Sequence, residues 1–271
     1  MDRDSYIKAR LQEHYVEALS VGKELIVVSL QGSQNYNLDL YTDEYKSDID
    51  TKAIVLPSFD DFCNSSKPFS HTHVRGNEEH IDMKDIRVMF DTFKKQNINF
   101  VEILFSDWYV VNEKYKMTWD RLRDLGEDLV HCHPAQTLRT MAGMCYEKHK
   151  ALCHPYPTIK HKIDKYGYDG KQLHHIIRVH EFMKNYLSGR SFKECLTATG
   201  EVKDLLIEAK LNMFSLDAAI KLADENLAAV DKLKADYIEK YGDNINPVPY
   251  KILEDIKLDT LKQWFKEQLL N

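Results

Sequence analysis

The sequence lacks long hydrophobic runs, paired cysteines and an excess of positive charge. Its apolar runs reach about six residues, far short of the roughly 20 that a membrane-spanning helix needs. The segment MDRDSYIKARLQEHY at the start has no apolar core of the kind found in secretory signal peptides. The five cysteines are odd in number and form no CxxC pair, which favours reduced thiols over a disulfide framework. We therefore expect a cytoplasmic protein with no membrane partner.

Net charge also limits which kinds of substrate and partner are expected. The formal net charge of −6 argues against an extended nucleic-acid-binding surface and weakens the case for an RNA substrate, although it leaves room for a local basic groove. A chain of 271 residues with 43% hydrophobic residues has enough material for two small domains or one large one. The sequence shows no internal repeat and no low-complexity tract.

The two halves of the chain have different hydrophobic patterns. The first half predicts a helix over 5–21, strands over Leu25–Leu30, Asp48–Leu56 and Glu78–Met83, a mobile loop over Cys63–Asn77, and a helix with apolar residues at 86, 89, 90 and 93. The second half predicts helices over 113–125, 134–152, 169–188, 201–212, 215–241 and 251–270. We therefore expect an α+β protein with a mixed-sheet domain over 1–112 and an all-helical domain over 113–271.

Two aspartates at the start of the second predicted strand are the main chemical signal. Alternate side chains of a strand share a face, so Asp48 and Asp50 point the same way while Ile49 enters the core. The first predicted strand ends in Gly32-Ser33, where a glycine lets the backbone approach phosphate closely. Two Mg²⁺ ions on such carboxylates stabilise the attacking and leaving oxygens of nucleotidyl transfer. An isolated D-x-D is more often a solvated strand edge, and only the combination predicts a site.

A third carboxylate is expected on a neighbouring strand. Asp82 lies between Ile81 and Met83, so its side chain should face away from the core. Glu79 and Asp85 are the competing candidates for this position.

The helix predicted over 169–188 offers a row of cations. Lys171, His175 and Arg178 recur at helical spacing, opposite an apolar stripe, and can bind a triphosphate. The neighbouring His174 is expected to be solvated. Taken alone, this row is typical of an ordinary solvated helix face.

Several segments resemble the DNA polymerase β-like nucleotidyltransferase superfamily, in particular a predicted family of bacteria and phages. These segments are GSQNY, SDID and DIRVMFDTFKKQNINFVEILF, which are similar to the family's G-S-x-x-Y-G, S-D-x-D and N-P-N-x-x-E-x-L-F patterns. The family's Y-D-x-K-x-x-x-H-x-x-R pattern is matched by Tyr168, Asp169, Lys171, His175 and Arg178. The resemblance covers most of residues 25–195. Asn37 replaces the family's second glycine, Ile98 replaces its proline, and the spacer Leu38–Lys46 is long and acidic.

The resemblance implies a polymerase β-like palm fold and a magnesium-dependent transferase, with manganese as an alternative ion. The implied reaction moves a nucleoside monophosphate from an NTP such as ATP to a hydroxyl and releases pyrophosphate. The implied catalytic and metal-binding residues are Asp48, Asp50 and Asp82, and the implied nucleotide-binding residues are Gly32, Ser33, Tyr36, Ser47, Lys171, His175 and Arg178. The helical domain would complete the cleft for the nucleotide and the acceptor.

The sequence leaves the acceptor open. An RNA end, a protein side chain and a small molecule all offer a hydroxyl, and a toxin–antitoxin enzyme that modifies tRNA would share the chemistry. A catalytically silent nucleotide- or partner-binding module on the same fold is the alternative. An intact set of Gly32, Ser33, Asp48 and Asp50 favours the enzyme, since clustered carboxylates repel one another and a silent copy has little reason to keep them.

Overall fold

The structure is a computed structural model that describes residues 2–42 and 45–270. Its contacts divide the chain into two compact units. The first, which we call the sheet unit, comprises Met1–Asn35, Asp39–Cys132 and Asn246–Asn271. The second, the helical unit, comprises Tyr36–Leu38 and His133–Ile245. Among the described residues, no helix is both long and apolar enough to cross a membrane.

The sheet unit is built on a five-stranded mixed sheet with the strand order β3-β4-β2-β1-β5. The strands are β1 (Glu24–Gln31), β2 (Asp50–Leu56), β3 (Ser70–Val74), β4 (His80–Asp85) and β5 (Tyr109–Val111). Strands β2 and β4 run parallel, and the other neighbouring pairs are antiparallel. The parallel pair matters for function because it sets Lys52 beside Asp82 in register.

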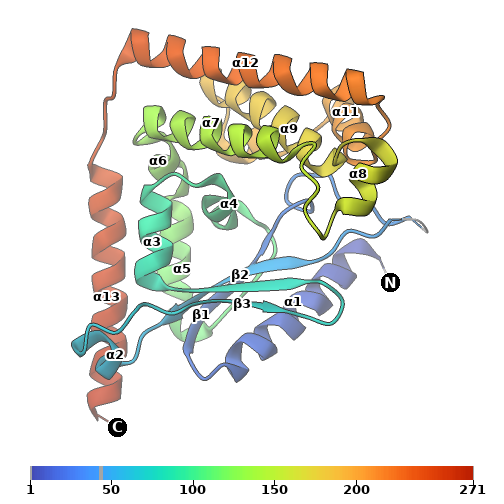
Figure 1. Ribbon diagram of the computed structural model, residues 1–271. Helices are drawn as coiled ribbons and strands as arrows, with labels where there is room; N and C mark the ends of the chain where they lie inside the picture. The colour runs from blue at the N-terminus through green and yellow to red at the C-terminus, as the bar shows by residue number, and fades with distance from the viewer. Residues whose placement is uncertain (1, 43–44, 271) are drawn as a thin grey trace. The chain divides into compact units, whose positions relative to one another are not determined.

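Helix α1 (Arg3–Ser20) covers one face of this sheet (Figure 1). It begins at the N-cap Asp2, whose side chain accepts a hydrogen bond from the N–H of Ser5. Its buried residues Ile7, Leu11 and Ala18 pack in one cluster with strand residues that include Val28, Ala53, Ile81 and Met83. Since side chains alternate along a strand, Asp50, Lys52 and Asp82 belong to the other face of the sheet.

The remaining helices of the sheet unit lie along the chain after β2. They are α2 (Phe59–Cys63), α3 (Ile86–Lys94), α4 (Ile98–Val101), the 3₁₀ helices η1 (Glu102–Phe105) and η2 (Glu113–Tyr115), α5 (Lys116–Asp124), α6 (Gly126–His131) and α13 (Val248–Leu270). Helix α13 packs against α3, α5 and α6. Near its end, Trp264 Nε1 donates a hydrogen bond to the Pro57 carbonyl at 2.7 Å.

The helical unit is formed by α7 (Pro134–Ala151), α8 (Lys160–Tyr166), α9 (Gly170–Leu187), α10 (Phe192–Leu196), α11 (Gly200–Lys210) and α12 (Leu216–Tyr241). Helix α9 is central, because it packs against α7, α10, α11 and α12. It is capped by Asp169, which accepts a hydrogen bond from the N–H of Lys171, and it buries apolar residues such as Leu173, Ile176 and Met183.

The expected α+β class, a mixed sheet with helices followed by a helical region, is confirmed. The contact-based units have other bounds than the predicted domains 1–112 and 113–271, because α5, α6 and α13 pack in the sheet unit. The Asn246 N–H donates to the Cys132 carbonyl at 2.7 Å, at the point where the chain leaves this unit and returns to it.

Two local predictions were wrong. The segment Cys63–Asn77 contains a strand, β3, which was missed because all five of its side chains are exposed and show no hydrophobic alternation. The second strand begins at Asp50, so Asp48 lies in the extended segment before it. The short helices α8 and α10 were also missed, since seven and five residues are too few to show a helical period.

Candidate active site

Asp48 and Asp50 flank the buried Ile49 where the chain enters β2. Ile49 is fully buried and both aspartates are partly exposed, so the alternation inferred from the sequence extends one residue pair beyond the strand. The His80 backbone N–H donates to Asp50 Oδ1 at 2.8 Å, and His80 Nδ1 lies 3.1 Å from the same oxygen. Asp50 is thereby held in place at the start of the parallel β2–β4 pair.

The Asp50 carboxyl has an elevated pKa. Burial is the main cause, and the negative charge of Asp48 adds to it, while the hydrogen bonds and charge of His80 act in the opposite direction. Two carboxylates that repel each other in a partly buried place are suited to a divalent cation, which would relieve both effects.

The turn after β1 is tied to these aspartates. Gly32 has a φ of +96°, a backbone conformation that favours glycine, and the Asn35 N–H donates to the Gly32 carbonyl at 3.0 Å. From the same turn, Gln34 Nε2 donates to the Asp48 carbonyl at 2.7 Å. The glycine-serine turn and the acidic segment, which the sequence predicted as two halves of one site, are therefore joined directly.

Glu102 is a residue that the sequence analysis did not single out. It is 2% exposed, and its Oε1 accepts a hydrogen bond from the Gly32 N–H at 3.2 Å. The contact helps to fix the turn and engages the Gly32 amide, while the Ser33 hydroxyl lies 3.5 Å from Gln34 Oε1. The segment NINFVEILF contains Glu102, but only the fold shows what it contacts.

Ser47 is buried and closes the loop before the acidic segment. Its hydroxyl accepts a hydrogen bond from the Leu40 N–H at 2.9 Å, and its own N–H donates to the Leu40 carbonyl at 2.8 Å. Nucleotide binding by Ser47 stays a prediction, and the structure adds a structural role in shaping this loop.

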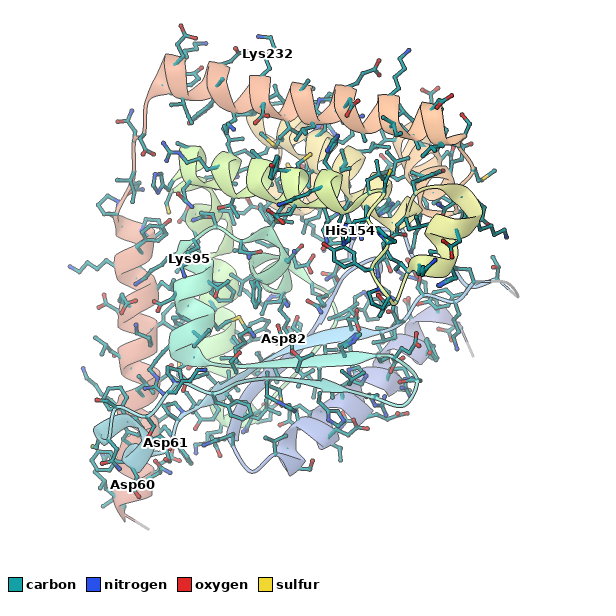
Figure 2. The ribbon with its side chains drawn as sticks, in the orientation of Figure 1. Asp60, Asp61, Asp82, Lys95, His154 and Lys232 are labelled. Carbon is teal, nitrogen blue, oxygen red and sulfur yellow. The ribbon has the colours of Figure 1, made fainter. Side chains whose placement is uncertain are left out.

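Asp82 lies on β4 (Figure 2). By the register of β2 and β4 and the alternation of side chains, it belongs to the same sheet face as Asp50. Its carboxylate is bound by two cations, Lys52 Nζ at 3.1 Å and Lys84 Nζ at 2.9 Å. Although burial acts to raise its pKa, the charges of Lys52 and Lys84 hold that pKa below its ordinary value. The Lys52 ammonium also lies 3.9 Å from the centroid of the Phe100 ring. Metal binding by Asp82 stays a prediction, and the structure gives Asp82 a second role as the partner of Lys52.

The two competitors for the third acid are engaged elsewhere. Glu79 is buried on the face covered by α1, where Arg10, His14 and Arg75 contact its carboxylate. Asp85 caps α3 and pairs with Arg87 at 2.7 Å.

No three side chains of the types His, Cys, Asp and Glu are grouped to hold a metal ion within residues 2–42 and 45–270. Asp48 and Asp50 still fit magnesium, which is commonly bound by one or two carboxylates together with waters and substrate phosphates. The raised pKa of Asp50 is the structural sign of this fit.

The helical unit brings two of the predicted nucleotide-binding residues together. The Arg178 guanidinium lies 4.1 Å from the centroid of the Tyr36 ring, and Arg178 is 5% exposed. Lys171, in the first turn of α9, is exposed, and His175 is partly buried. The matching Tyr168 and Asp169 are structural here, since the Tyr168 hydroxyl donates to the Phe214 carbonyl at 3.0 Å and Asp169 caps α9.

The histidines of α9 differ from expectation. His174 was expected to be solvated, but it is buried with Nδ1 2.9 Å from the Leu206 carbonyl, and burial lowers its pKa to about 3. Burial also holds the pKa of His175 well below its ordinary value, helped by the charge of Arg178. At neutral pH the His175 ring is therefore uncharged and can offer a hydrogen bond but no positive charge.

The sequence matches no protein-family model and no curated protein. Among solved structures, a nucleotidyltransferase-like protein from Exiguobacterium sibiricum 255-15 is similar at 12% identity, over 85% of this chain and 75% of that one, with a TM-score of 0.28. A likeness at this TM-score supports no conclusion about this chain.

Proposed function

We propose that the protein is a metal-dependent nucleotidyltransferase that moves a nucleoside monophosphate from an NTP to a hydroxyl acceptor. The observation that carries this proposal is the junction of the Gly32–Asn35 turn with the acidic segment, made by the 2.7 Å hydrogen bond from Gln34 to the Asp48 carbonyl. A glycine-serine turn tied to the segment that carries two carboxylates supports the proposal, because the reaction needs donors for phosphate close to ligands for a divalent ion.

In the proposed reaction the acceptor hydroxyl releases its proton to water as its oxygen forms a bond to the α-phosphorus. The bond from the α-phosphorus to the bridging oxygen breaks, and pyrophosphate leaves with the electron pair. Negative charge is concentrated around the reacting phosphate while these bonds form and break. The residues nearby must therefore compensate that charge and hold the substrates in fixed positions.

Asp48 and Asp50 would hold the divalent ion, magnesium or alternatively manganese. When bound, this ion supplies positive charge to the phosphate oxygens and orients the substrate. The Ser33 N–H and hydroxyl would donate to a phosphate, and Glu102 would keep the turn in its conformation through the Gly32 amide. His80 would keep the Asp50 carboxylate oriented through its backbone N–H.

Lys52 would supply a protein cation on the same face. It is 4% exposed, and burial lowers its pKa, an effect that Asp82 partly reverses. The ion pair with Asp82 favours the charged form of the lysine and limits where its ammonium can lie.

The part played by the helical unit stays a prediction. Tyr36, Lys171, His175 and Arg178 are expected to bind the nucleotide, and the cation–π contact of Arg178 with Tyr36 fixes one buried positive charge in that unit. ATP as the donor is likewise a prediction.

A second candidate is a nucleotide-binding module without catalysis. It is favoured by the two lysines on Asp82, because a third carboxylate neutralised in this way would not serve as a metal ligand.

The deciding experiment incubates the protein with each NTP labelled at the α-phosphate, with Mg²⁺ and with RNA, protein and small-molecule fractions as acceptors. We expect label in one acceptor fraction and equimolar pyrophosphate. Asp48→Asn should remove transfer, whereas the control Asp60→Asn, at an exposed position of α2, should not. Binding of NTP with no label transferred to any fraction would establish the second candidate.

A further inference from the structure

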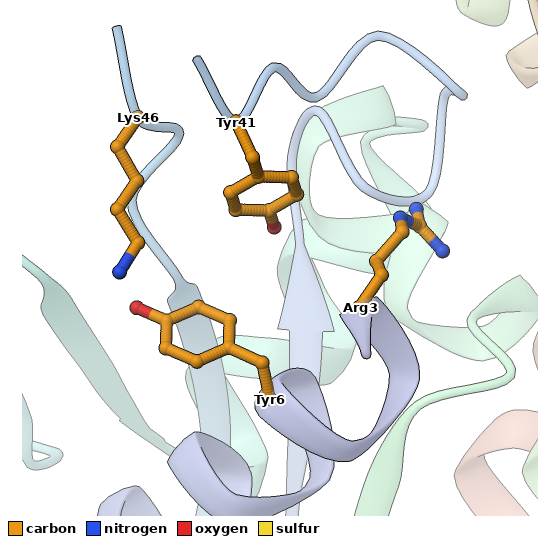
Figure 3. Close-up of a pocket in the computed structure, with 4 residues that line it drawn as sticks. All are labelled: Arg3, Tyr6, Tyr41 and Lys46. Atoms are coloured by element: carbon orange, nitrogen blue, oxygen red, sulfur yellow. The ribbon is translucent and has the colours of Figure 1, made fainter. Parts of the chain in front are cut away.

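A pocket of about 380 Å³ opens at the start of α1 (Figure 3). It is lined by Arg3 and Tyr6 of α1 and by Tyr41 and Lys46 of the loop between β1 and β2. The two tyrosine rings meet edge to face, with centroids 6.0 Å apart and planes at 78°. Its volume is that of a small-molecule site, and two aromatic rings within it suit a flat, aromatic occupant.

The two cations that line the pocket, Arg3 and Lys46, differ in their carboxylate partners. The Arg3 guanidinium donates to both carboxylate oxygens of Asp39, at 2.6 and 2.9 Å, and its charge is therefore balanced within the protein. The Lys46 ammonium lies 4.3 Å from the centroid of the Tyr6 ring, and none of the carboxylates in the described part of the chain forms a salt bridge with it. Lys46 is thus the cation of this pocket that an anionic group would meet.

One side chain connects the pocket with the aspartates. Gln34 Nε2 donates to the Tyr41 hydroxyl at 3.3 Å and to the Asp48 carbonyl at 2.7 Å. An occupant that contacts Tyr41 is therefore separated by one side chain, Gln34, from the segment that carries Asp48.

We propose that this pocket is the acceptor subsite and that it takes the terminal nucleotide of a single RNA or DNA strand. The base packs against the tyrosines, and the adjacent phosphate binds the Lys46 ammonium. This inference deepens the proposed function and rests on it for the acceptor role. Stacking on aromatic side chains together with a cation for the backbone is the general way in which proteins hold single strands.

The charge of the pocket limits the footprint to about one phosphate. Among the described residues that line the pocket, Lys46 is one cation and Arg3 is balanced by Asp39, and the chain as a whole carries a formal charge of −6. A long strand bound along its backbone would need several more cations. The end of a strand meets this limit, and it also presents the terminal hydroxyl that transfer requires.

The test measures the anisotropy of short labelled RNA and DNA oligonucleotides with the full chain, in Mg²⁺ and without NTP. Tyr41→Leu and Lys46→Gln should each raise the Kd by about five-fold or more, since stacking of one base is worth about 1–3 kcal/mol. Tyr41→Phe keeps the ring and should retain most of the affinity. The controls Tyr146→Leu and Lys8→Gln change an exposed tyrosine and an exposed lysine outside the pocket and should have no effect.

Salt dependence gives a second measure. For a single strand, each phosphate contact contributes about −0.7 to the slope of log K against log salt concentration, so we expect a slope near that value and almost none in Lys46→Gln. A slope equivalent to several phosphates, or a Kd unchanged in both Tyr41→Leu and Lys46→Gln, would overturn the inference.

The same oligonucleotides then serve as acceptors in the transfer assay. Label transferred to their ends, and reduced in Lys46→Gln, supports the acceptor role. Label found only on proteins or small molecules overturns the inference and leaves the proposed function intact. Oligonucleotides that bind through Tyr41 and Lys46 but receive no label, when no other acceptor does, overturn the proposed function and leave a nucleotide-binding pocket. Free NTP that displaces the oligonucleotide shows that the pocket takes the donor nucleotide, which also overturns the acceptor assignment.

Discussion

His14 and Glu79 are joined inside the sheet unit, with His14 Nε2 3.0 Å from Glu79 Oε2 and both side chains almost fully buried. The other ring nitrogen, Nδ1, lies 2.9 Å from the Thr51 hydroxyl on β2. Arg10 of α1 and Arg75 also contact Glu79. One buried carboxylate therefore links α1, β2 and β4, and it does so on the sheet face opposite Asp50 and Asp82.

This relationship gives a prediction about stability. Glu79→Gln should lower the free energy of unfolding by about 3 kcal/mol, because loss of one partner from a buried ion pair leaves the others uncompensated. The control is Glu13→Gln, which removes a half-exposed carboxylate from the same two arginines and should cost about 1 kcal/mol or less. Urea denaturation of both variants checks this. Equal losses would show that Glu79 is no more important than a surface ion pair.

The same carboxylate makes stability depend on pH. Burial alone would raise the pKa of Glu79, but hydrogen bonds from His14 and Arg10 lower it to about 2, against an ordinary value of 4.5. Its contribution should be complete above pH 4.5 and should be lost as the pH falls towards 2. In Glu79→Gln the fall in stability over this interval should be smaller than in the wild type, as thermal unfolding at a series of pH values would show.

Unlike Glu79, Asp50 should lower the stability of the fold at neutral pH, although transfer depends on it. Its pKa is raised, so the ionised carboxyl destabilises the fold at pH 7 and this penalty disappears as the pH falls through the raised pKa. Asp50→Asn should therefore raise the melting temperature at pH 7 and leave it nearly unchanged in strong acid. It should lower transfer by more than the roughly 10–100-fold typical for an outer-shell partner of a metal.

Magnesium provides the control for the prediction about Asp50. Mg²⁺ should raise the melting temperature of the wild type by binding the folded state, and it should have no such effect in Asp50→Asn. A variant that keeps both full activity and the magnesium response would show that Asp50 is not a metal ligand.

The role of Asp82 can be assigned from the magnesium dependence of transfer in an Asp82 variant. Since Lys52 and Lys84 bind its carboxylate, we expect Asp82→Asn to slow transfer while leaving the magnesium concentration for half-maximal rate unchanged. Lys52→Met should produce a similar loss of rate. If Asp82→Asn raises the magnesium requirement strongly and Lys52→Met does not slow transfer, Asp82 is the third metal ligand that the sequence predicted.

The cations of α9 give a prediction about affinity. Lys171→Ala should raise the Kd for a non-hydrolysable NTP by roughly ten-fold, since a hydrogen bond to a charged group contributes about 1.5–3 kcal/mol. Lys171 is exposed, so its variant should fold normally, whereas the buried Arg178 is better tested by Arg178→Lys. Calorimetric titration measures both, and unaltered affinities would remove this helix from the nucleotide site.

His175 should behave differently from the two cations. The sequence suggests a loss of affinity in His175→Ala that depends on pH, but the pKa of the partly buried ring lies well below its ordinary value, so we expect the ring to be neutral from pH 6 to 8. Any loss of NTP affinity in His175→Ala should therefore be constant over that interval. A loss that grows as the pH falls from 8 to 6 would show that the ring is charged in the complex.

The sequence predicted features that depend on local spacing. Asp48, Ile49 and Asp50 alternate between faces because a chain entering a strand is already extended, and Gly32 marks a turn because its φ is positive. The helix that carries Lys171 and Arg178 was found from its 3.6-residue periodicity.

Features set by the pairing of distant segments could not be predicted in the same way. Lys52 meets Asp82 only because β2 and β4 are parallel in one particular register, and nothing near either residue specifies that register. Likewise Glu102 contacts Gly32 from 70 residues away. Strand β3 is held by its hydrogen bonds to β4, and its exposed side chains carry no pattern that would mark it.

The return of α13 to the sheet unit bears on how the chain folds during synthesis. Domains of most multidomain chains fold from the N-terminus onward as they leave the ribosome. Here α3, α5 and α6 cannot complete their packing until α13, which ends at Leu270, has been synthesised. Every residue of the helical unit is synthesised before α13. The helical unit can therefore be folded while the part of the sheet unit that was synthesised first still exposes apolar surface. Mutations that weaken the packing of α13 should consequently reduce the yield of folded protein in cells more than they reduce the stability of the protein once it has folded.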